Sequence, residues 1–528
     1  MKNYEVIIAG AGHNGLVVAG YLAKAGVKVL VVEARDYVGG GAASREVAAP
    51  GFKTNVASIG HQIIQANPLL KDDELGLKAK YGLEYIFPEK VVGGIFPDDR
   101  LLVLSRSVDK TCESVAQFSQ RDAEAYRKFY QWGHSQLEML LAGTFIPTPS
   151  FGTMNSYMET SPEGRELMRC MYVSGHDLAK EWFKDPHIYN MTDRLGSENM
   201  LDPRVDGSGI NLLLLVAFVH DYGIGYCKGG SGNLAAALVR SIEDRGGEIR
   251  TSSPVKQFKV SGGRAVGVIL EDGEEILASK AVVTNFNIIQ LDAAMLGTSD
   301  LPEEYLHNIK VMRMPGFQPF HQGLALHEAP CYKAGTEADW TSSIEFLPDT
   351  EEDLNKIWDD FNNGIPHVDI PLAIPVTRWD PTQAPAGKHT LYLYHYNPYN
   401  LKGGAHRWDE IKQEIADKIL EYLASRCTNM DSKNIIGRWA SSPLDFERNN
   451  RAWYQGNFCH IGGQISQNFG LRPFPLVSNY RLPVDKLYIC GPSTHPGPGI
   501  TGGGRAAVVV IMDDMGINFD DVITGSLA

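Results

Sequence analysis

A glycine-rich turn near the start of the chain constrains the fold more than any other feature. The stretch GAGHNG, residues 10–15, follows the apolar run YEVIIA and precedes LVVAGYLAKAG, with small and apolar residues at helical spacing, and then the apolar run VKVLVVE. Apolar strands that read as continuous runs are typical of a parallel sheet buried on both faces. The order strand, turn, helix, strand therefore predicts the βαβ unit of a doubly wound α/β fold.

The spacing within this turn predicts a bound dinucleotide. Gly10, Gly12 and Gly15 match G-x-G-x-x-G, whose glycines allow a tight turn, close approach of the backbone to a pyrophosphate, and close packing of helix on strand. The free N–H groups of the following helix N-terminus favour that anion. Glu33 ends the second strand about 20 residues further on, where a carboxylate binds a ribose diol and repels a 2′-phosphate. These residues predict a dinucleotide site and disfavour NADP.

A second glycine pair, Gly39-Gly40, follows shortly after Glu33. NAD needs no diglycine there, whereas the longer FAD needs more backbone close to its phosphates. At this point the sequence resembles the FAD flavoproteins with two dinucleotide-binding motifs. GGSGNLAAALVRSIEDRGGEIRTSSPVKQF, from residue 229, is similar to their internal block. LYICGPSTHPGPGITGGGRAA, from residue 487, resembles the C-terminal flavin block of phytoene desaturase-like proteins, in particular the phytoene dehydrogenase-related and carotene ketolase-type bacterial branch.

The resemblance implies a noncovalent FAD in a discontinuous Rossmann-like domain formed by residues 1–80, 225–300 and 470–528. Residues 81–224 and 301–469 would then form an inserted α+β substrate-binding domain with a helical insertion. Cys227 has no base beside it in the sequence, so a buried structural thiol is a better interpretation than a covalent flavin link. The residues that match FAD contacts are Gly10, Ala11, Gly12, Asn14, Gly15, Glu33, Ala34, Arg35, Gly40, Gly41, Ala42, Val255, Gly491, Ile500 and Thr501.

Local patterns predict further elements. After the glycines at 229–230 we expect a helix over 233–245, a strand over 248–251, a hairpin around Gly262-Gly263 and a closing strand over 281–284. The stretch 408–426 predicts an amphipathic helix, with Ile411, Ile415, Ile419 and Leu423 on one face. Its polar face is acidic, which favours a core-facing helix over one on a membrane surface.

Composition excludes several function classes. The net charge is −14 and no Lys/Arg cluster is present, which argues against nucleic-acid binding. The seven cysteines are far apart and never in CxxC spacing, so we expect neither a disulfide framework nor a metal site. The longest apolar run, 212–218, is far shorter than the roughly 20 residues that cross a bilayer. We expect a cytoplasmic protein, with peripheral contact to the inner face of a membrane left open.

The sequence offers four candidate catalytic residues. Oxidation of a C–H bond by a flavin needs the carbon held against N5 and a group that takes a proton. His61, His220 and His495 could take that proton, because the ordinary pKa of histidine lies near neutrality, and Tyr226 could line the cavity. Each histidine also has a structural alternative: His61 as a partner of the flavin, His220 as a hydrogen-bonded core residue, and His495 as part of the flavin loop. The face shared by Tyr392, Tyr394 and Tyr396 is more typical of a core than of a pocket.

The leading functional hypothesis is an FAD-dependent dehydrogenase, desaturase or oxidase. It would take hydride from a carbon of a small, largely apolar organic substrate, carotenoid-like or ring-containing, onto flavin N5. Two alternatives stay open: a redox-neutral isomerase or amine oxidase-like flavoenzyme, and a flavin-bound interaction or assembly protein without catalysis. We expect oxygen or a quinone as electron acceptor, no nucleic-acid partner, and a monomer or homodimer.

Overall fold

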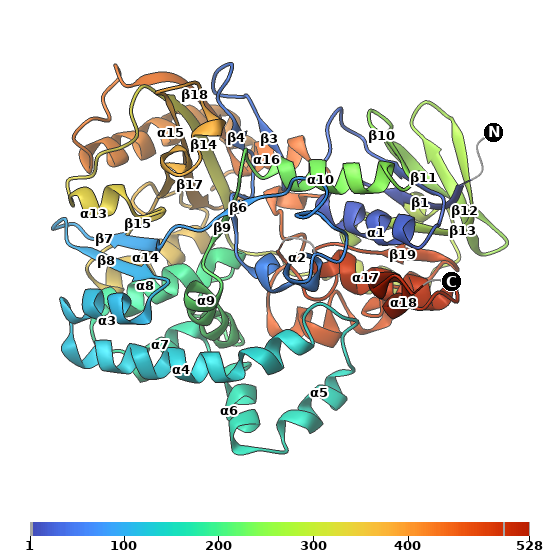
Figure 1. Ribbon diagram of the computed structural model, residues 1–528, viewed down its shortest axis with the longest axis horizontal. Coiled ribbons are helices and arrows are strands. Elements are labelled where there is room, and N and C mark those ends of the chain that lie inside the picture. Colours follow the sequence, from blue (N-terminus) through green and yellow to red (C-terminus); the bar gives the residue numbers. More distant parts are fainter. Residues whose placement is uncertain (1–3, 500–501, 527–528) are drawn as a thin grey trace.

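Two sheets, each of seven strands, organise the molecule (Figure 1). The structure is a computed structural model that describes residues 4–499 and 502–526. In Figure 1 the first sheet lies on the right with both ends of the chain, and the second sheet lies on the left.

The first sheet has a parallel core in the order β10-β2-β1-β13, with β19 paired to β13 beside β1. The antiparallel strands β12 and β11 extend it from the first half of β13. The predicted α/β fold with a Rossmann-like parallel sheet is confirmed. The strands are β1 (Tyr4–Ala9), β2 (Val29–Val32), β10 (Glu248–Arg250), β11 (Val255–Ser261), β12 (Arg264–Leu270), β13 (Glu275–Thr284) and β19 (Leu487–Ile489).

Three helices cover one face of this sheet: α1 (His13–Lys24), α10 (Gly232–Glu243) and α17 (Gly502–Asp514). Helix α1 packs against both others. Gly504 comes so close to α1 that its N–H donates to Oδ1 of Asn14 at 2.8 Å, and a Cβ at this position would lie 2.5 Å from the Asn14 carbonyl oxygen. The first and last parts of the chain are therefore in direct contact.

The β11–β12 hairpin forms where the sequence predicts it. Gly262 and Gly263 have φ of 59° and 76°. Two consecutive residues with positive φ are what a type I′ turn requires, and glycine adopts that conformation without a Cβ clash.

The second sheet has the order β18-β14-β17-β16-β15-β7-β8 and is antiparallel except between β15 and β7. Helix α15 (Trp408–Ser425) packs on one face, with Ile415, Ile419 and Leu423 buried, which confirms the predicted core-facing helix. The strands are β7 (Lys90–Ile95), β8 (Leu101–Ser105), β14 (Gln318–Leu326), β15 (Ser343–Phe346), β16 (Leu372–Ile374), β17 (His389–Asn397) and β18 (Ile435–Ser441).

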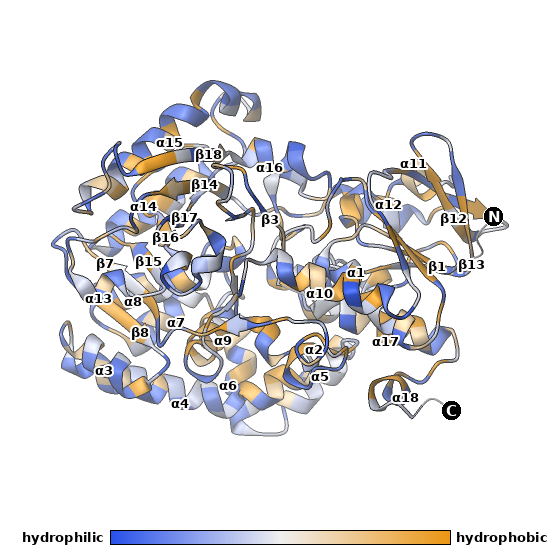
Figure 2. Ribbon diagram, turned by 45° about the horizontal axis from the view of Figure 1, so that its top comes forward, coloured by the Kyte–Doolittle hydropathy of each residue, from blue (hydrophilic) through white to orange (hydrophobic). Residues whose placement is uncertain are grey.

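Seven helices between the sheets in sequence form a layer below the second sheet in Figure 1. Figure 2 shows hydrophobic colouring on the inner helix α9 and more hydrophilic colouring on the outer helices α3 and α4. Among the described residues, no helix is both long enough and apolar enough to cross a membrane. The seven are α3 (Val108–Ala116), α4 (Gln120–Ala142), α5 (Phe151–Met158), α6 (Pro162–Cys170), α7 (Gly175–Trp182), α8 (Pro186–Gly196) and α9 (Gly209–Asp221).

Short elements connect the two halves. In a three-stranded sheet, β9 pairs with β5 and β6, and this places His61 opposite Gly225. The domain boundaries given above stay predictions, although the first sheet draws its strands from residues 4–32, 248–284 and 487–489. The remaining helices and strands are α2 (Pro68–Lys71), α11 (Ala293–Leu296), α12 (Glu303–Lys310), α13 (Thr336–Asp339), α14 (Glu351–Asn362), α16 (Pro443–Asn449), α18 (Phe519–Thr524), β3 (Ser44–Arg45), β4 (Thr54–Asn55), β5 (Gly60–His61), β6 (Tyr85–Ile86) and β9 (Gly225–Cys227).

Candidate functional site

A cavity of about 450 Å³ lies at the carboxyl ends of the parallel strands of the first sheet. Gly10 follows β1, Glu33 follows β2 and Asn285 follows β13, and all three line this cavity. Ligands of open α/β sheets bind outside the carboxyl ends of the strands, because the connecting loops diverge there. We call this the first cavity.

Two glycine loops form its floor. The N–H of Gly39 donates to the carbonyl of Ala11 at 2.8 Å, and the N–H of His13 donates to the carbonyl of Gly39 at 3.3 Å. A Cβ on Gly40 would lie 3.1 Å from the Cα of Gly12, and Gly40 has a φ of 59°. The second diglycine therefore lies against the first glycine turn, and both leave their backbone open to the cavity.

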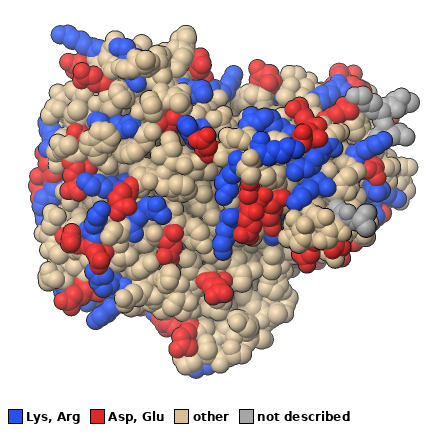
Figure 3. Space-filling view, in the orientation of Figure 1, with Lys and Arg blue, Asp and Glu red and all other residues tan. Residues whose placement is uncertain are grey.

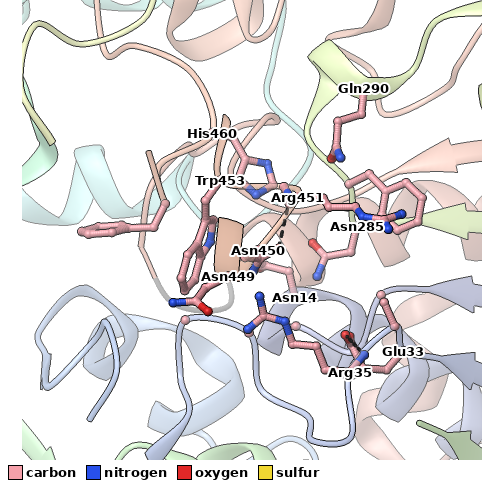
Figure 4. Close-up of a pocket in the computed structure, with 18 of the residues that line it drawn as sticks. Asn14, Glu33, Arg35, Asn285, Gln290, Asn449, Asn450, Arg451, Trp453 and His460 are labelled. Atoms are coloured by element: carbon pink, nitrogen blue, oxygen red, sulfur yellow. Dashed lines mark hydrogen bonds between the residues drawn. The ribbon is translucent and has the colours of Figure 1, made fainter. Parts of the chain in front are cut away.

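Glu33 lies at the edge of this floor. One carboxylate oxygen accepts the N–H of Ala11 at 2.8 Å and the other accepts the N–H of Arg35 at 3.0 Å. Burial raises the pKa of Glu33, while the two backbone N–H groups oppose that shift. The side chain is fixed in place and lines the cavity, as a ribose-binding carboxylate must (Figure 4).

Asn285 was not predicted from the sequence. Its side chain lies between two glycines: a Cβ on Gly12 would come within 2.5 Å of its Nδ2, and a Cβ on Gly491 would overlap its Oδ1. Among the described residues, its buried Oδ1 has no hydrogen-bond partner. A buried acceptor left free in a ligand cavity indicates that a ligand donor completes it. The signal in the sequence is its position, directly after a parallel strand.

These residues fit FAD. Glycine backbone is open where the pyrophosphate would lie, Glu33 is at the ribose position, and Asn285 offers a free acceptor. Of the residues predicted to bind FAD, nine line the cavity: Gly10, Gly12, Asn14, Glu33, Ala34, Arg35, Gly40, Gly41 and Val255. Ala11, Gly15, Ala42 and Gly491 are buried behind this lining. Ile500 and Thr501 lie outside the described residues.

The opposite wall comes from a segment that sequence analysis missed. Residues 448–453 and His460 line the first cavity from above, facing Asn14, Glu33 and Arg35 in Figure 4. Nδ1 of His460 lies 3.0 Å from Oγ of Ser493, and burial lowers the pKa of His460 to about 3, so the ring is neutral. This wall has no repeat or glycine pattern that would reveal it in the sequence.

A second cavity, of about 220 Å³, adjoins the first and shares Ala57, Ser58, Phe458 and Gly499 with it. One wall is a face of the second sheet, including Leu372, Ile374, Tyr392 and Tyr394. Tyr392 and Tyr394 are also part of a hydrophobic cluster, so this face serves both as core and as cavity wall.

His61 and Tyr226, two of the predicted catalytic residues, line this second cavity. Nδ1 of His61 lies 2.8 Å from the Tyr85 hydroxyl, and burial lowers the pKa of His61 to about 3. Burial also holds the pKa of Tyr85 well above its usual range, so Tyr85 keeps its proton and donates it to Nδ1. This hydrogen bond assigns the ring proton of His61 to Nε2, which is buried without a partner among the described residues. His61 is therefore a donor toward the cavity and not a base.

The other two predicted histidines line neither cavity. Nε2 of His220 lies 3.0 Å from the Tyr126 hydroxyl and Nδ1 lies 3.3 Å from the Arg106 carbonyl, within the helical layer. Nε2 of His495 donates to the Gly143 carbonyl at 2.8 Å. The structure thus places both in their structural alternatives, because each ring is already engaged by the protein.

Two carboxylates in the second cavity were also missed from the sequence. Glu198, in the short 3-10 helix Ser197–Asn199 after α8, and Glu345, on β15, both line it. Arg194 lies between them: Nη1 donates to Glu198 at 2.7 Å, and Nη2 lies 3.0 Å from Oε2 of Glu345. Burial raises the pKa of Glu345, and Arg194 opposes the shift. Two carboxylates thus share one guanidinium.

Cys227 is buried, and its burial raises the pKa of the thiol to about 12, so it carries no thiolate at neutral pH. Within residues 4–499 and 502–526, no group of three His, Cys, Asp or Glu side chains is arranged to hold a metal ion.

Comparison with known proteins agrees with this site. Residues 8–72 match the NAD(P)-binding Rossmann-like domain family, and residues 87–316 match the flavin containing amine oxidoreductase family. Pyridine nucleotide-disulfide oxidoreductase domain-containing protein 2 of Rattus norvegicus is 30% identical over 560 residues, covering 97% of this chain and 94% of the rat protein.

Two bacterial relatives are also similar over nearly their full length. A limonene dehydrogenase polypeptide of Castellaniella defragrans is 29% identical, covering 98% of this chain and 96% of that protein. A lycopene-forming phytoene desaturase of a Paracoccus species is 26% identical, covering 96% of this chain and 97% of that protein.

Among solved structures, cyclohexylamine oxidase from Brevibacterium oxydans superposes with a TM-score of 0.60 at 16% identity, covering 98% of this chain and 100% of that chain. This likeness concerns the fold alone. Together with the glycine loops, Glu33 and the matching families, it leads to one conclusion. The chain belongs to the flavin-containing amine oxidoreductase family and is an FAD-dependent oxidoreductase with phytoene desaturases among its relatives.

Proposed function

We propose that the protein dehydrogenates a compact, ring-containing hydrocarbon held in the second cavity and introduces a C=C bond. The observation that carries this proposal is the apolar and aromatic lining of that cavity where it adjoins the FAD site. Its volume of about 220 Å³ is below the roughly 300–1,000 Å³ of pockets for drug-sized ligands. A compact ring therefore suits it better than a long polyene.

Two relatives act on hydrocarbons according to their names, limonene in one case and phytoene in the other. This supports a hydrocarbon substrate here. When bound, FAD supplies a two-electron acceptor for hydride. Gly12, Gly40 and Asn285 would hold its phosphate region and Glu33 its ribose. The residues of the second cavity would exclude water and fix the orientation of the substrate, which is the main need of such a reaction.

His61 contributes a fixed donor to this arrangement. Its Nε2–H faces the second cavity near Gly499, at the junction of the two cavities. A neutral donor there can orient a polar group of either ligand without adding charge to the site. Tyr85 keeps the ring in the required tautomer by donating to Nδ1.

A second candidate function, oxidation of an amine, is favoured by one observation. Glu198 and Glu345 carry one negative charge more than Arg194 neutralises, and an ammonium group would be attracted to it. A redox-neutral isomerisation and a role as a flavin-bound assembly factor stay as further alternatives.

Anaerobic mixing of the purified flavoprotein with candidate substrates separates these functions. We expect limonene to bleach the absorption of the oxidised flavin, and cyclohexylamine and phytoene to bleach it at least about tenfold more slowly, a difference of roughly 1.4 kcal/mol in barrier. Bleaching by cyclohexylamine alone would instead establish amine oxidation. Rearrangement of a substrate without bleaching would identify an isomerase, and no reaction with any of them would contradict the proposal.

The remaining partner assignments are proposals as well. We propose oxygen or a quinone as the final electron acceptor, which reoxidation of the reduced protein by each compound tests. A peripheral membrane contact is supported by exposed Ile146, Tyr157 and Tyr172 around α5 and α6. Figure 3 shows few charges on that lower lobe, and basic and acidic side chains interspersed elsewhere on this face, a pattern that supports no nucleic-acid partner. Sedimentation with lipid vesicles and size-exclusion chromatography test membrane contact and the choice between monomer and homodimer.

A further inference from the structure

The second cavity contains more titratable side chains than a purely apolar substrate needs. Its lining includes His61, Glu198, Glu345, Cys459 and three tyrosines. A desaturation must also release a proton, and the groups named so far do not accept one. The cavity lining therefore has to be searched for a base.

Most of these groups are excluded by their protonation state. His61 presents an N–H to the cavity, because Tyr85 donates to its other ring nitrogen. Burial raises the pKa of the Cys459 thiol to about 12 and holds the pKa values of Tyr226, Tyr392 and Tyr394 above their usual range. None of these groups is a proton acceptor near neutral pH. The carboxylates remain.

The two carboxylates differ in their contacts. Oε1 of Glu198 accepts Nη1 of Arg194 at 2.7 Å and the Tyr396 hydroxyl at 3.2 Å. Glu345 is within ion-pair distance of Arg194 at 3.0 Å, but its Oε2 receives no aligned hydrogen bond from the described residues. Arg194 itself is fully buried and its guanidinium lies 4.4 Å from the Tyr396 ring centroid, so it cannot move toward Glu345 without losing these contacts.

Glu345 is thus the carboxylate that is left free to bind a proton. Its side chain is 5% exposed and projects from β15 on the same sheet face as the cavity-lining Leu372 and Tyr394. The charged and titratable groups that face it are Arg194 from α8, Glu198 beyond it, and Tyr396 from β17. With one cation for two carboxylates, the cluster carries an excess negative charge, which a proton neutralises at low cost.

We propose that Glu345 is the proton acceptor of the second cavity, whose carboxylate takes the proton that the substrate loses as the new double bond forms. The inference rests on the function proposed above. The substrate carbon that gives up hydride loses two electrons, and FAD gains them. The neighbouring C–H bond then breaks, its electron pair becomes the second bond of the C=C, and the proton binds to a Glu345 oxygen. Arg194 is a positioning residue that keeps both carboxylates in the cavity wall.

The first test needs no substrate. Infrared difference spectra of the FAD-loaded protein between about pH 6.5 and about pH 9.5 lie above the range near 4 where ordinary glutamates titrate. We expect a protonated-carboxyl band that disappears across this range in the wild type and in Glu337→Gln, a surface control paired with Lys90. The band should be absent in Glu345→Gln. An unchanged band in Glu345→Gln would overturn the assignment.

The second test follows flavin bleaching by limonene under anaerobic conditions as a function of pH. A general base contributes roughly 10²- to 10⁴-fold, so Glu345→Gln should bleach at least about 100-fold more slowly and lose the rise in rate with pH. Glu345→Asp keeps the carboxyl group on a side chain one methylene shorter, and should retain the rise at an intermediate rate. Bleaching by Glu345→Gln at the wild-type rate would refute the role in proton transfer.

The two tests separate the inference from the function on which it rests. If limonene leaves the wild-type flavin oxidised while the infrared band depends on Glu345, the proposed substrate is wrong and Glu345 is still the proton-binding group of the cavity. If limonene bleaches the flavin and the band does not depend on Glu345, the proposed function stands and the inference fails.

Discussion

Replacement of Gly504 by alanine tests whether the contact between α1 and α17 holds the FAD site together. The new Cβ would lie 2.5 Å from the Asn14 carbonyl oxygen, 3.0 Å from the Val17 Cβ and 3.1 Å from the Asn14 Cα, although Cβ contacts below 3.0 Å essentially do not occur. The helices must therefore separate by at least about 0.5 Å, because all three atoms belong to the rigid part of α1. That movement stretches the hydrogen bond from Gly504 N–H to Asn14.

The magnitude follows from three contributions. Overpacking costs about 1–3 kcal/mol, the weakened hydrogen bond costs about 1 kcal/mol, and alanine in a helix gains about 1 kcal/mol over glycine. The free energy of unfolding should therefore fall by about 1–3 kcal/mol. Since Asn14 lines the first cavity, its displacement should also weaken FAD binding, by roughly tenfold for each 1.4 kcal/mol lost.

The assay combines thermal melting with the flavin content of the purified protein and the dissociation constant for added FAD. Gly152→Ala is the matched control, because Gly152 lies in helix α5 with no atom within 4 Å of its added Cβ. The control should keep its flavin. Wild-type flavin affinity and melting temperature in Gly504→Ala would show that the α1–α17 contact does not set the geometry of the site, and would refute the reasoning.

Three other outcomes are expected. Gly152→Ala should itself raise the free energy of unfolding by about 0.5–1 kcal/mol, which a higher melting temperature would show and a lower one would contradict. Arg194→Met leaves Glu345 buried without a cation and should destabilise the protein by about 3–5 kcal/mol in urea unfolding; adding Glu345→Gln should restore part of the loss. Stability should also fall as the pH drops below about 6.5, by about 1 kcal/mol per pH unit for each histidine whose folded pKa is lowered, because the unfolded chain binds protons that the folded one excludes. His176 and His367, whose pKa values are raised, lose their contribution at higher pH and so offset two of these; equal urea stability at pH values of about 7 and 5 would contradict this balance. The histidines with a pKa lowered to about 3 or 4 are His13, His61, His321, His395, His460 and His495.

The features that could be predicted from the sequence are those set by neighbouring residues. The strands β1 and β2, the glycine turn between them and Glu33 lie within 30 residues, and each has a local pattern. The FAD site could be predicted on this side for the same reason. Asn285 and residues 448–453 complete it from elsewhere in the chain, where single polar residues after a strand or in a loop have no distinctive spacing.

The second cavity depends on contacts that no local pattern encodes. Arg194 and Glu345 are on a helix and a strand that meet only through the tertiary fold, so their ion pair has no counterpart in the sequence. His220 and His495 were candidates because histidine titrates near neutral pH, but their hydrogen bonds to Tyr126 and Gly143 depend on residues far away in the chain. Residue type predicts a possible role, and burial decides it.

The contact between Asn14 and Gly504 joins residues 490 positions apart, and Gly491 packs on Asn285 beside the same cavity. During synthesis, residues 4–33 leave the ribosome long before α17 exists to cover α1. The nascent chain therefore cannot retain its flavin tightly until the final α/β segment has emerged and docked. Cofactor capture is expected to be a late event in biogenesis, and it would act as a check that the whole chain has been made.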